Sequence, residues 1–387
     1  MGGASDAIVI NEIMYHPEGG NTSHEFIELL NMGDGPIKVE GWQFTSGIGI
    51  VLPELTIPAG GFLVLTADAE EFVSVYGEVD RLVGGWSGSL SNRGERLRLV
   101  DEKGEQVDEV SYYDQGDWAV RTRVSDTGEP GWIWQSRHDG GGESLELINP
   151  ALTNQSGQNW GSSQEGPTPG SLNSIARGDS EIAPLILDVS HSPLVPRSTD
   201  PVTVRARLDD VETRGLSMTL HYRVSALDPP DFTSVVMSDD GLHNDGAADD
   251  GVFGATLPAM ENQDVVEFYL SADDGLNSRT WPAPTDIGQV ANLHYQVDDA
   301  PDPQGAGIYR LIMTASENRA FNRIDRDSNA QHHCTLVADD CSGPVVRYQC
   351  GVRVRGASSR QDTPPPMRLN LPRDRKWNGE SLSLIHI

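Results

Sequence analysis

The stretch VRVRGASSR, residues 352–360, gathers arginine, glycine and serine around one short turn. Glycine lets backbone N–H groups approach the oxygens of an anion, while hydroxyls and guanidinium groups supply further donors. Proteins that handle phosphoryl groups mostly position phosphates and neutralise their charge, so this donor set suits phosphate. The alternative is a tight turn between two strands with solvated arginines. The candidate phosphate-binding residues are Arg355, Gly356, Ser358, Ser359, Arg360 and Arg368.

The surrounding residues predict a unit of mixed α and β structure over residues 307–381. YRLIMTASENRAFNRI, residues 309–324, is expected to form a strand and then a short helix. Thr314 and Glu317 have capping-box spacing at the start of that helix, although Ser316 is a rival cap. HHCTLVADDCSGPVVRYQCGVRVRG, residues 332–356, is expected to form a hairpin, and MRLNLP, residues 367–372, a further strand.

This unit resembles the N-terminal lobe of the CotH spore-coat kinase family. In that family a strand ends in an Arg-Gly-x-Ser-Ser turn, which Arg355, Gly356, Ser358 and Ser359 match, and YRLIMTASENRAF resembles the strand and helix that open the domain. The resemblance implies a secreted bacterial protein kinase that binds ATP and Mg²⁺ and phosphorylates serine or threonine of a protein substrate.

The chain departs from the family pattern in two ways. Family members place lysine beside the arginine of the second strand, whereas this chain has Pro365, Pro366 and Met367 before Arg368. The carboxylates that bind the metal and act in catalysis lie further downstream in the family. Without metal ligands or a base no phosphoryl transfer is expected, so we expect an inactive N-terminal fragment with no catalytic residue of its own. The final LSLIHI, residues 382–387, matches a translated sequencing adapter and is expected to be an artefact, the alternative being ordinary strand residues.

An aspartate-rich stretch, SDDGLHNDGAADDGVFGA, offers hard oxygen ligands of the kind that Ca²⁺ prefers. The spacing does not fit an EF-hand loop. The alternative is a loop between Val236 and Val252 that uses Asp-Gly turn chemistry. The candidate calcium ligands are Asp240, Asn244, Asp245, Asp249 and Asp250, with Asp239 beside them.

The three cysteines lie close together in the sequence, at positions 334, 341 and 350, after His332 and His333. No CxxC spacing is present, so zinc is the less favoured explanation. A hairpin centred on Ser342 would place Cys334 opposite Cys350, where a disulfide can form. Pairing of Cys341 with either partner is the alternative. Cysteines confined to one unit fit an oxidising compartment.

The first 175 residues predict an antiparallel β-sandwich. In ERLRLV, Leu97 and Leu99 are expected to face the core, and AEEFVSVYG is expected to form a helix closed by Gly77. VINEIMYHP, EFIELLNMGDGPIKVEGWQF, IPAGGFLVLTAD and LSNRGERLRLVDEKGEQVDEVSY resemble a bacterial, secreted lamin-tail domain, and the closing GESLELINPALTNQSGQNWGSSQEGPTPGSLN resembles the end of such domains. The resemblance implies an immunoglobulin-like sandwich over residues 6–175 that serves as an accessory module.

A second, smaller immunoglobulin-like sandwich is expected over residues 183–298, after a polar linker at 176–182 and before Pro301 and Pro303. In PVTVRARL the apolar residues from Val202 to Leu208 alternate onto one face. The tryptophans at 118, 132, 134 and 160 invite a comparison with sugar-stacking residues, but core packing is the more usual role of tryptophan in a sandwich.

The charge distribution excludes some classes of partner. From Pro301 onward there are 12 Lys and Arg against 9 Asp and Glu, leaving 16 against 49 in the first 300 residues. So acidic a surface disfavours nucleic acid and anionic membranes. No apolar run reaches 18 residues, so no membrane span is expected, and the start MGGASDAIVINEI lacks the apolar core of a signal peptide. We therefore expect a protein substrate or an extracellular polymer as partner and, from the resemblances, an extracellular or cell-surface bacterial protein. The alternative function is an adhesion or matrix-binding scaffold, stiffened by calcium, whose kinase-like lobe is degenerate.

Overall fold

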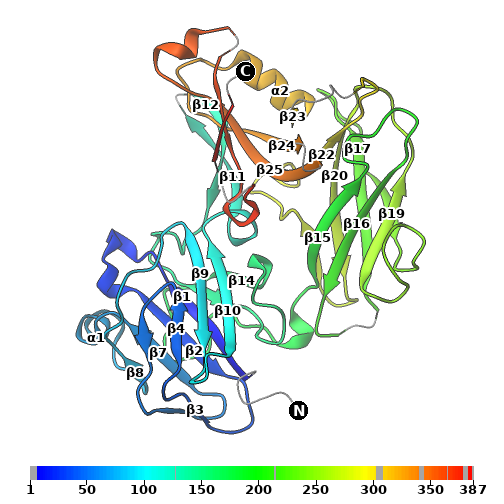
Figure 1. Cartoon of the computed structure of the whole chain (residues 1–387). Helices are drawn as coiled ribbons and strands as arrows, with labels where there is room; N and C mark the ends of the chain where they lie inside the picture. The colour runs from blue at the N-terminus through cyan, green and yellow to red at the C-terminus, as the bar shows by residue number, and fades with distance from the viewer. Residues whose placement is uncertain are drawn as a thin grey trace. The chain divides into compact units, whose positions relative to one another are not determined.

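The computed structural model describes residues 7–126, 128–212, 215–301, 308–339, 344–363, 365–377 and 382–385. The fold is mainly β, as predicted, and contains several antiparallel sheets (Figure 1). The chain forms two compact units, and the division into three consecutive domains stays a prediction. One consists of Met1–Ala119 with Gln135–Ile182, and the other of Val120–Trp134 with Ala183–Ile387. Residues 120–134, which lie within the range expected for the first sandwich, therefore group with the second unit.

The first unit is built from two main sheets. One has the strand order β14 (Trp160–Ser162), β13 (Leu145–Leu147), β1 (Ile8–Met14), β2 (Phe26–Asn31), β7 (Phe62–Thr66) and β8 (Leu82–Val83). The other has the order β10 (Gln106–Tyr113), β9 (Gly94–Val100), β4 (Gln43–Ser46) and β5 (Ile50–Val51). A short ladder joins β3 (Ile37–Lys38) to β6 (Thr56–Ile57). Neighbouring strands are antiparallel except β7 and β8, which are parallel.

Alternation of side chains accounts for the core between these sheets. Leu97 and Leu99 on β9 are fully buried, as predicted, among apolar residues of both sheets. Trp118 and Trp160 belong to the same cluster, 5.9 Å apart between ring centroids. These two tryptophans therefore have the core-packing role and are not surface platforms for sugars.

The helix predicted in this unit is α1 (Ala69–Tyr76). The Asp68 side chain caps it by accepting the N–H groups of Glu70 and Glu71, and Gly77 ends it with a φ of 88°. Such a positive φ is available to glycine at little cost. Phe72 carries the buried face of the helix and packs against Phe26 on the sheet.

Three glutamates lie side by side on β13, β1 and β2. Glu12 is in register with both Glu146 and Glu28, and all three side chains are fully buried. A later segment closes over them: the N–H groups of Thr168 and Gly170 donate to Glu12 and Glu28, and the Thr168 hydroxyl donates to Glu146. Burial raises the pKa of Glu12 to about 8; burial and the neighbouring Glu12 raise that of Glu28 to about 9. The segment around residues 168–170 is thus an integral part of the sandwich.

The second unit contains two sheets of an immunoglobulin-like sandwich. One has the order β15 (Leu185–Ser192), β16 (Val202–Asp209) and β19 (Val252–Leu257). The other has the order β18 (Thr233–Met237), β17 (Ser217–Val224), β20 (Val265–Asp273) and β21 (Ser278–Trp281), with β22 (Leu293–Gln296) also pairing with β20. Val202, Val204, Ala206 and Leu208 all point into the core, as predicted from their alternation.

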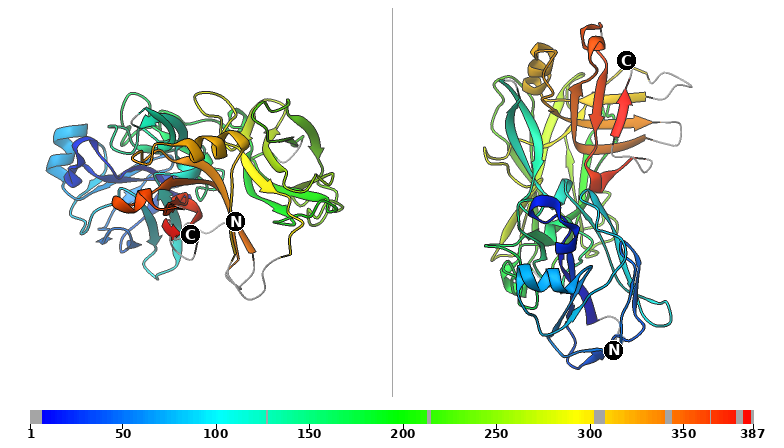
Figure 2. Two further views of the ribbon diagram at one scale, coloured as in Figure 1. Left: turned by 90° about the horizontal axis from the view of Figure 1, so that it is seen from above. Right: turned by 90° about the vertical axis from the view of Figure 1, so that its left-hand side faces the viewer.

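The rest of this unit is a five-stranded antiparallel sheet, a helix and a separate hairpin. The sheet has the order β23 (Ile308–Ile312), β24 (His332–Asp339), β25 (Pro344–Val354), β26 (Met367–Asn370) and β27 (Leu382–Ile385), so part of the terminal LSLIHI pairs with β26. Helix α2 (Ala315–Arg323) lies along one face of this sheet (Figure 2). The hairpin consists of β11 (Val120–Asp126) and β12 (Glu129–Gln135).

Of the two N-cap residues predicted for helix α2, Thr314 and Ser316, the structure uses Thr314. The Thr314 hydroxyl accepts the N–H of Glu317, so Thr314 rather than Ser316 is the N-cap. The Glu317 carboxylate does not return the bond. It accepts bonds from Trp132 Nε1 at 2.9 Å and His332 Nδ1 at 3.1 Å. Within the described ranges, no helix combines the length and apolar character that a membrane span would need.

Candidate anion-binding site

The bend between β25 and β26 is shaped by a glycine and a serine. Gly356 has a φ of 104°, and an ideal Cβ placed on it would lie 2.1 Å from Ser359 Oγ, so no larger residue fits there without rearrangement. A 3₁₀ turn, η7 (Ser358–Gln361), follows. The Arg355 N–H donates to Pro366 O at 3.0 Å and closes the base of the bend. The predicted turn is thus present, with Ser358 exposed at its tip.

Arg360 holds the bend in place. Its side chain is 9% exposed, and each guanidinium nitrogen donates to a nearby oxygen. Nε donates to Gly356 O at 2.7 Å, and Nη1 donates to Arg326 O and Ser328 O, each at 2.9 Å. Nη2 donates to Asn329 Oδ1 at 2.6 Å. Arg360 was expected to contact phosphate, but these bonds engage its donors inside the protein and give it a structural role.

Two other arginines face each other across the strands. Arg353 on β25 lies directly opposite Arg368 on β26, and alternation places Arg355 on the same face. Like charges in such a pair repel each other. Burial lowers the pKa of the Arg353 guanidinium, and the charges of Arg368, Arg360 and Arg355 lower it further, while Asp126 opposes the shift.

No carboxylate forms an ion pair with these three arginines within the described ranges. Arg353 Nη1 donates to the neutral Asn329 Oδ1 at 2.8 Å, and Arg368 Nε donates to Asn370 Oδ1 at 3.2 Å. The Arg355 side chain makes no hydrogen bond to any residue that the structure describes, and it is only partly buried. Positive charge is therefore concentrated on one face of β25 and β26 and is only partly offset by the nearby Asp126, an arrangement that favours anion binding.

The candidate set from the sequence was incomplete. Arg353 was not included, although the alternation in VRVR indicates that it shares a face with Arg355. Asn329, which holds both Arg353 and Arg360, was also missed. No local pattern could have identified it, because it lies in a loop more than 20 residues before the bend.

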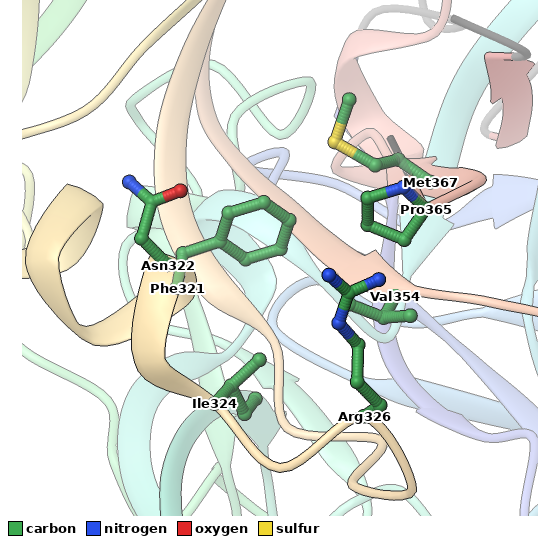
Figure 3. Close-up of a pocket in the computed structure, with 7 residues that line it drawn as sticks. All are labelled: Phe321, Asn322, Ile324, Arg326, Val354, Pro365 and Met367. Carbon is green, nitrogen blue, oxygen red and sulfur yellow. The ribbon is translucent and has the colours of Figure 1, made fainter. Parts of the chain in front are cut away.

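A pocket of about 240 Å³ lies on the opposite face of the same two strands. Val354 and Met367, which pair across the strands, line it together with Phe321 and Ile324 from α2 and its end (Figure 3). Arg326 also lines it and donates to Arg360 O and to Asp362 O. Because side chains alternate across a strand, this mostly apolar pocket is separate from the arginine face.

The two histidines before Cys334 are buried in the second unit and form internal hydrogen bonds. Burial alone would raise the pKa of Glu317, but hydrogen bonds from His332 and Trp132 hold it at about 2. His333 Nε2 bonds to Asn292 O at 2.7 Å, and burial together with the charges of His294 and Arg121 lowers the pKa of His333 to about 3. Among the described residues, no group of three or more His, Cys, Asp or Glu is arranged to hold a metal ion.

The predicted register of the cysteine hairpin is confirmed. Cys334 lies opposite Cys350, and both are fully buried. Both are free thiols in this structure, so the predicted disulfide is not formed in it and stays a prediction. Burial raises the pKa of both thiols above the usual range, which keeps them protonated and unreactive. Cys341 lies outside the described residues.

The aspartate-rich loop uses its carboxylates to hold its own backbone. Asp245 accepts the N–H groups of Asp240, Gly241 and His243. The neighbouring residues behave alike: Asp239 accepts from Asp250 and Gly251, Asp250 accepts from Ala247 and Val252, and Asn244 and Asp249 adopt positive φ. This is the turn chemistry that was the alternative to calcium binding. Calcium binding here stays a prediction.

Comparison with known protein families gives a match within the first unit. Residues 3–114 match the family model of the Lamin Tail Domain, which supports the resemblance seen in the sequence over that range. No curated protein matches the chain. Among solved structures, one similar chain is an uncharacterized protein of Listeria monocytogenes EGD-e, in complex with α-D-glucose, β-D-glucose, magnesium and calcium. It shares 11% identity at a TM-score of 0.21, and the match covers 50% of this chain and 19% of that one.

Proposed function

We propose that the bend between β25 and β26 binds the phosphate groups of a nucleotide, as the nucleotide-binding lobe of a CotH-type protein kinase would. In this proposal the lamin-tail and immunoglobulin-like sandwiches dock the lobe to a protein or an extracellular polymer. The observation that carries the proposal is the clustered charge of Arg353, Arg355 and Arg368, none in an ion pair with a described carboxylate, beside an exposed glycine-serine turn.

The arrangement suits phosphate for two physical reasons. Three guanidinium groups without carboxylate partners lower the free energy of any anion placed between them, and their repulsion is relieved when it binds. The exposed backbone at Gly356 and Ala357 and the Ser358 hydroxyl can add donors to the same anion. The hydrogen bonds of Arg360 fix the bend before a ligand binds, so less conformational entropy is lost on binding.

The residues that the structure describes do not provide a matching place for Mg²⁺. Hard carboxylate oxygens are its usual protein ligands, and among the described residues no group of three or more His, Cys, Asp or Glu side chains is arranged to hold a metal ion. The proposal is therefore one of phosphate binding and includes no transfer step.

The test is calorimetric titration of the chain with ATP and, separately, with tripolyphosphate, comparing wild type with Arg355→Gln. The Arg355 side chain makes no hydrogen bond to a described residue, so its replacement removes a ligand contact without breaking an internal one. A charge-assisted hydrogen bond is worth about 1.5–3 kcal/mol, so we expect affinity to fall about tenfold or more.

The matched control is Arg319→Gln, which makes the same charge change on the exposed surface of α2. It should leave affinity nearly unchanged at physiological ionic strength, where distant surface charges are screened. If the wild-type chain bound neither ligand, or if both variants weakened binding equally, the phosphate site would be refuted and the adhesion scaffold with a degenerate lobe would be favoured.

A further inference from the structure

The hairpin β11–β12 packs against the loop that carries the arginine contacts. The Trp132 N–H donates to Gln331 O at 2.8 Å, and Trp132 is 2% exposed. A Cβ placed on Gly131 would lie 2.8 Å from Ala330 Cβ, so the two backbones approach more closely than a side chain allows. The hairpin belongs to the second unit in space, although its sequence interrupts the first.

The end of β11 reaches the arginine site through one intermediate residue. Asp126 Oδ2 accepts the Asn329 N–H at 2.5 Å and the Ser328 hydroxyl at 3.1 Å. Asn329 Oδ1 in turn accepts Arg353 Nη1 at 2.8 Å and Arg360 Nη2 at 2.6 Å. A single amide oxygen thus holds two guanidinium groups that would otherwise repel each other, and the Asp126 carboxylate fixes the backbone of that amide.

We propose that Asp126 and Asn329 are positioning residues for the arginine site, so that the hairpin controls how Arg353 faces an incoming anion. The role in anion binding rests on the proposed function of the bend, whereas the positioning of Arg353 and Arg360 does not. Asp126 has two opposite effects. Its hydrogen bonds preorganise the site, which favours binding, and its negative charge near Arg353 disfavours an anion.

These two effects can be separated by comparing Asp126→Ala with Asp126→Asn. Asparagine keeps an oxygen that can accept from Asn329 and Ser328 but removes the charge, whereas alanine removes both. The matched control is Asp327→Asn, which removes a charge from an exposed aspartate of the same loop that makes no side-chain bond to a described residue. Asn329→Ala is a second variant that releases both arginines directly while leaving the hairpin intact.

The first measurement needs no ligand. Phenylglyoxal modifies accessible arginines, and peptide mass spectrometry gives the rate at each one. We expect Asp126→Ala and Asn329→Ala to accelerate modification of Arg353 and Arg360 several-fold, while Asp126→Asn and Asp327→Asn stay near the wild-type rate. If Asp126→Ala and Asn329→Ala left both rates unchanged, the positioning role would be overturned.

The second measurement is calorimetric titration with tripolyphosphate. We expect Asp126→Ala to weaken binding about tenfold, the loss of one well-placed charged contact. Asp126→Asn should bind about threefold more tightly than wild type, because a neighbouring negative charge is gone and the geometry is kept. If both Asp126 variants bound tripolyphosphate more tightly to the same extent, Asp126 would act through its charge alone, and the positioning role would be overturned. If wild type failed to bind while the labelling rates changed as expected, only the proposed function would fail.

Discussion

Two of the three buried glutamates of the first unit, Glu12 and Glu28, make the stability of the fold depend on pH in an unusual direction. The Thr168 hydroxyl lies 2.7 Å from Glu146 Oε1 and 3.5 Å from Glu12 Oε2. A hydroxyl has one proton, so when it donates to Glu146 it can only accept from Glu12. Protonated Glu12 meets that need, in agreement with its pKa of about 8.

The magnitude follows from linkage. The folded state keeps a proton on Glu12 up to about pH 8, whereas the unfolded chain releases it near pH 4.5. This contribution to stability is fully present below pH 4.5 and is lost as pH rises through 8. The loss is about 1.4 kcal/mol per pH unit, or about 3 kcal/mol between pH 5 and pH 7, for this one group. Glu28, whose pKa is also raised, adds a loss of the same sign.

The variant Glu12→Gln tests this reasoning because an amide imitates a protonated carboxyl group. Its NH₂ group can donate to Thr168, and its oxygen can accept from Ser144 and the Thr168 N–H, the present partners of Glu12 Oε1. We expect the variant to equal wild type near pH 4.5 and to be more stable by about 3 kcal/mol at pH 7, the loss that linkage gives for ionisation of Glu12.

The assay is amide hydrogen exchange of β1 and β2 in the intact chain between pH 5 and pH 8, corrected for the intrinsic dependence of exchange on pH. The corrected rates give the free energy of opening this sheet. Glu54→Gln, an exposed residue of the same unit, is the control and should keep the wild-type slope. If Glu12→Gln also kept that slope, or were less stable than wild type at pH 7, Glu12 would be ionised in the folded protein and the reasoning would be wrong.

Three further predictions concern the second unit. Burial lowers the pKa of His294 to about 4 and that of His333 to about 3. The stability that these neutral histidines contribute to the folded state is therefore present above pH 6.5 and is lost as pH falls through these pKa values. Amide hydrogen exchange of β22 and β24 should accelerate in acid for this reason. Trp132→Phe should destabilise the unit by about 1–3 kcal/mol in thermal denaturation, because it leaves Glu317 Oε1 without its indole donor; an unchanged midpoint would contradict this. Gly356→Ala should weaken tripolyphosphate binding, because its Cβ would meet Ser359 Oγ at a positive φ, and unaltered affinity would show that the bend does not matter.

Alternation and capping signals carried most of the fold information in the sequence. Leu97, Val204 and their neighbours alternate because one face of each strand is buried, so the strands could be predicted from spacing alone. The helix caps at Gly77 and Thr314 could be predicted from the sequence because they depend on a few adjacent residues. The grouping of residues 120–134 with the second unit was not readable, since it depends on contacts such as Trp132 with Glu317, 185 residues apart.

The site shows the same division between local and distant causes. The turn at Gly356 and the arginines that follow strand alternation could be found from the sequence. The role of Arg360 could not, because three of the oxygens it binds come from residues 326–329, which no local pattern connects to the bend. An arginine beside a serine turn has the same appearance in a sequence whether its donors face solvent or backbone carbonyls.

Because the hairpin β11–β12 lies within the sequence of the first unit but packs in the second, the two sandwiches cannot be separated by a single cut in the chain. A protein truncated after residue 182 would retain β11 and β12 without the partners that bury Trp132 and Arg121. That ribbon would expose an aromatic strand edge prone to self-association. A soluble form of the N-terminal sandwich would instead require excision of residues 120–134 and a short polar bridge from Ala119 to Gln135, and the remainder would need the ribbon supplied as a separate peptide.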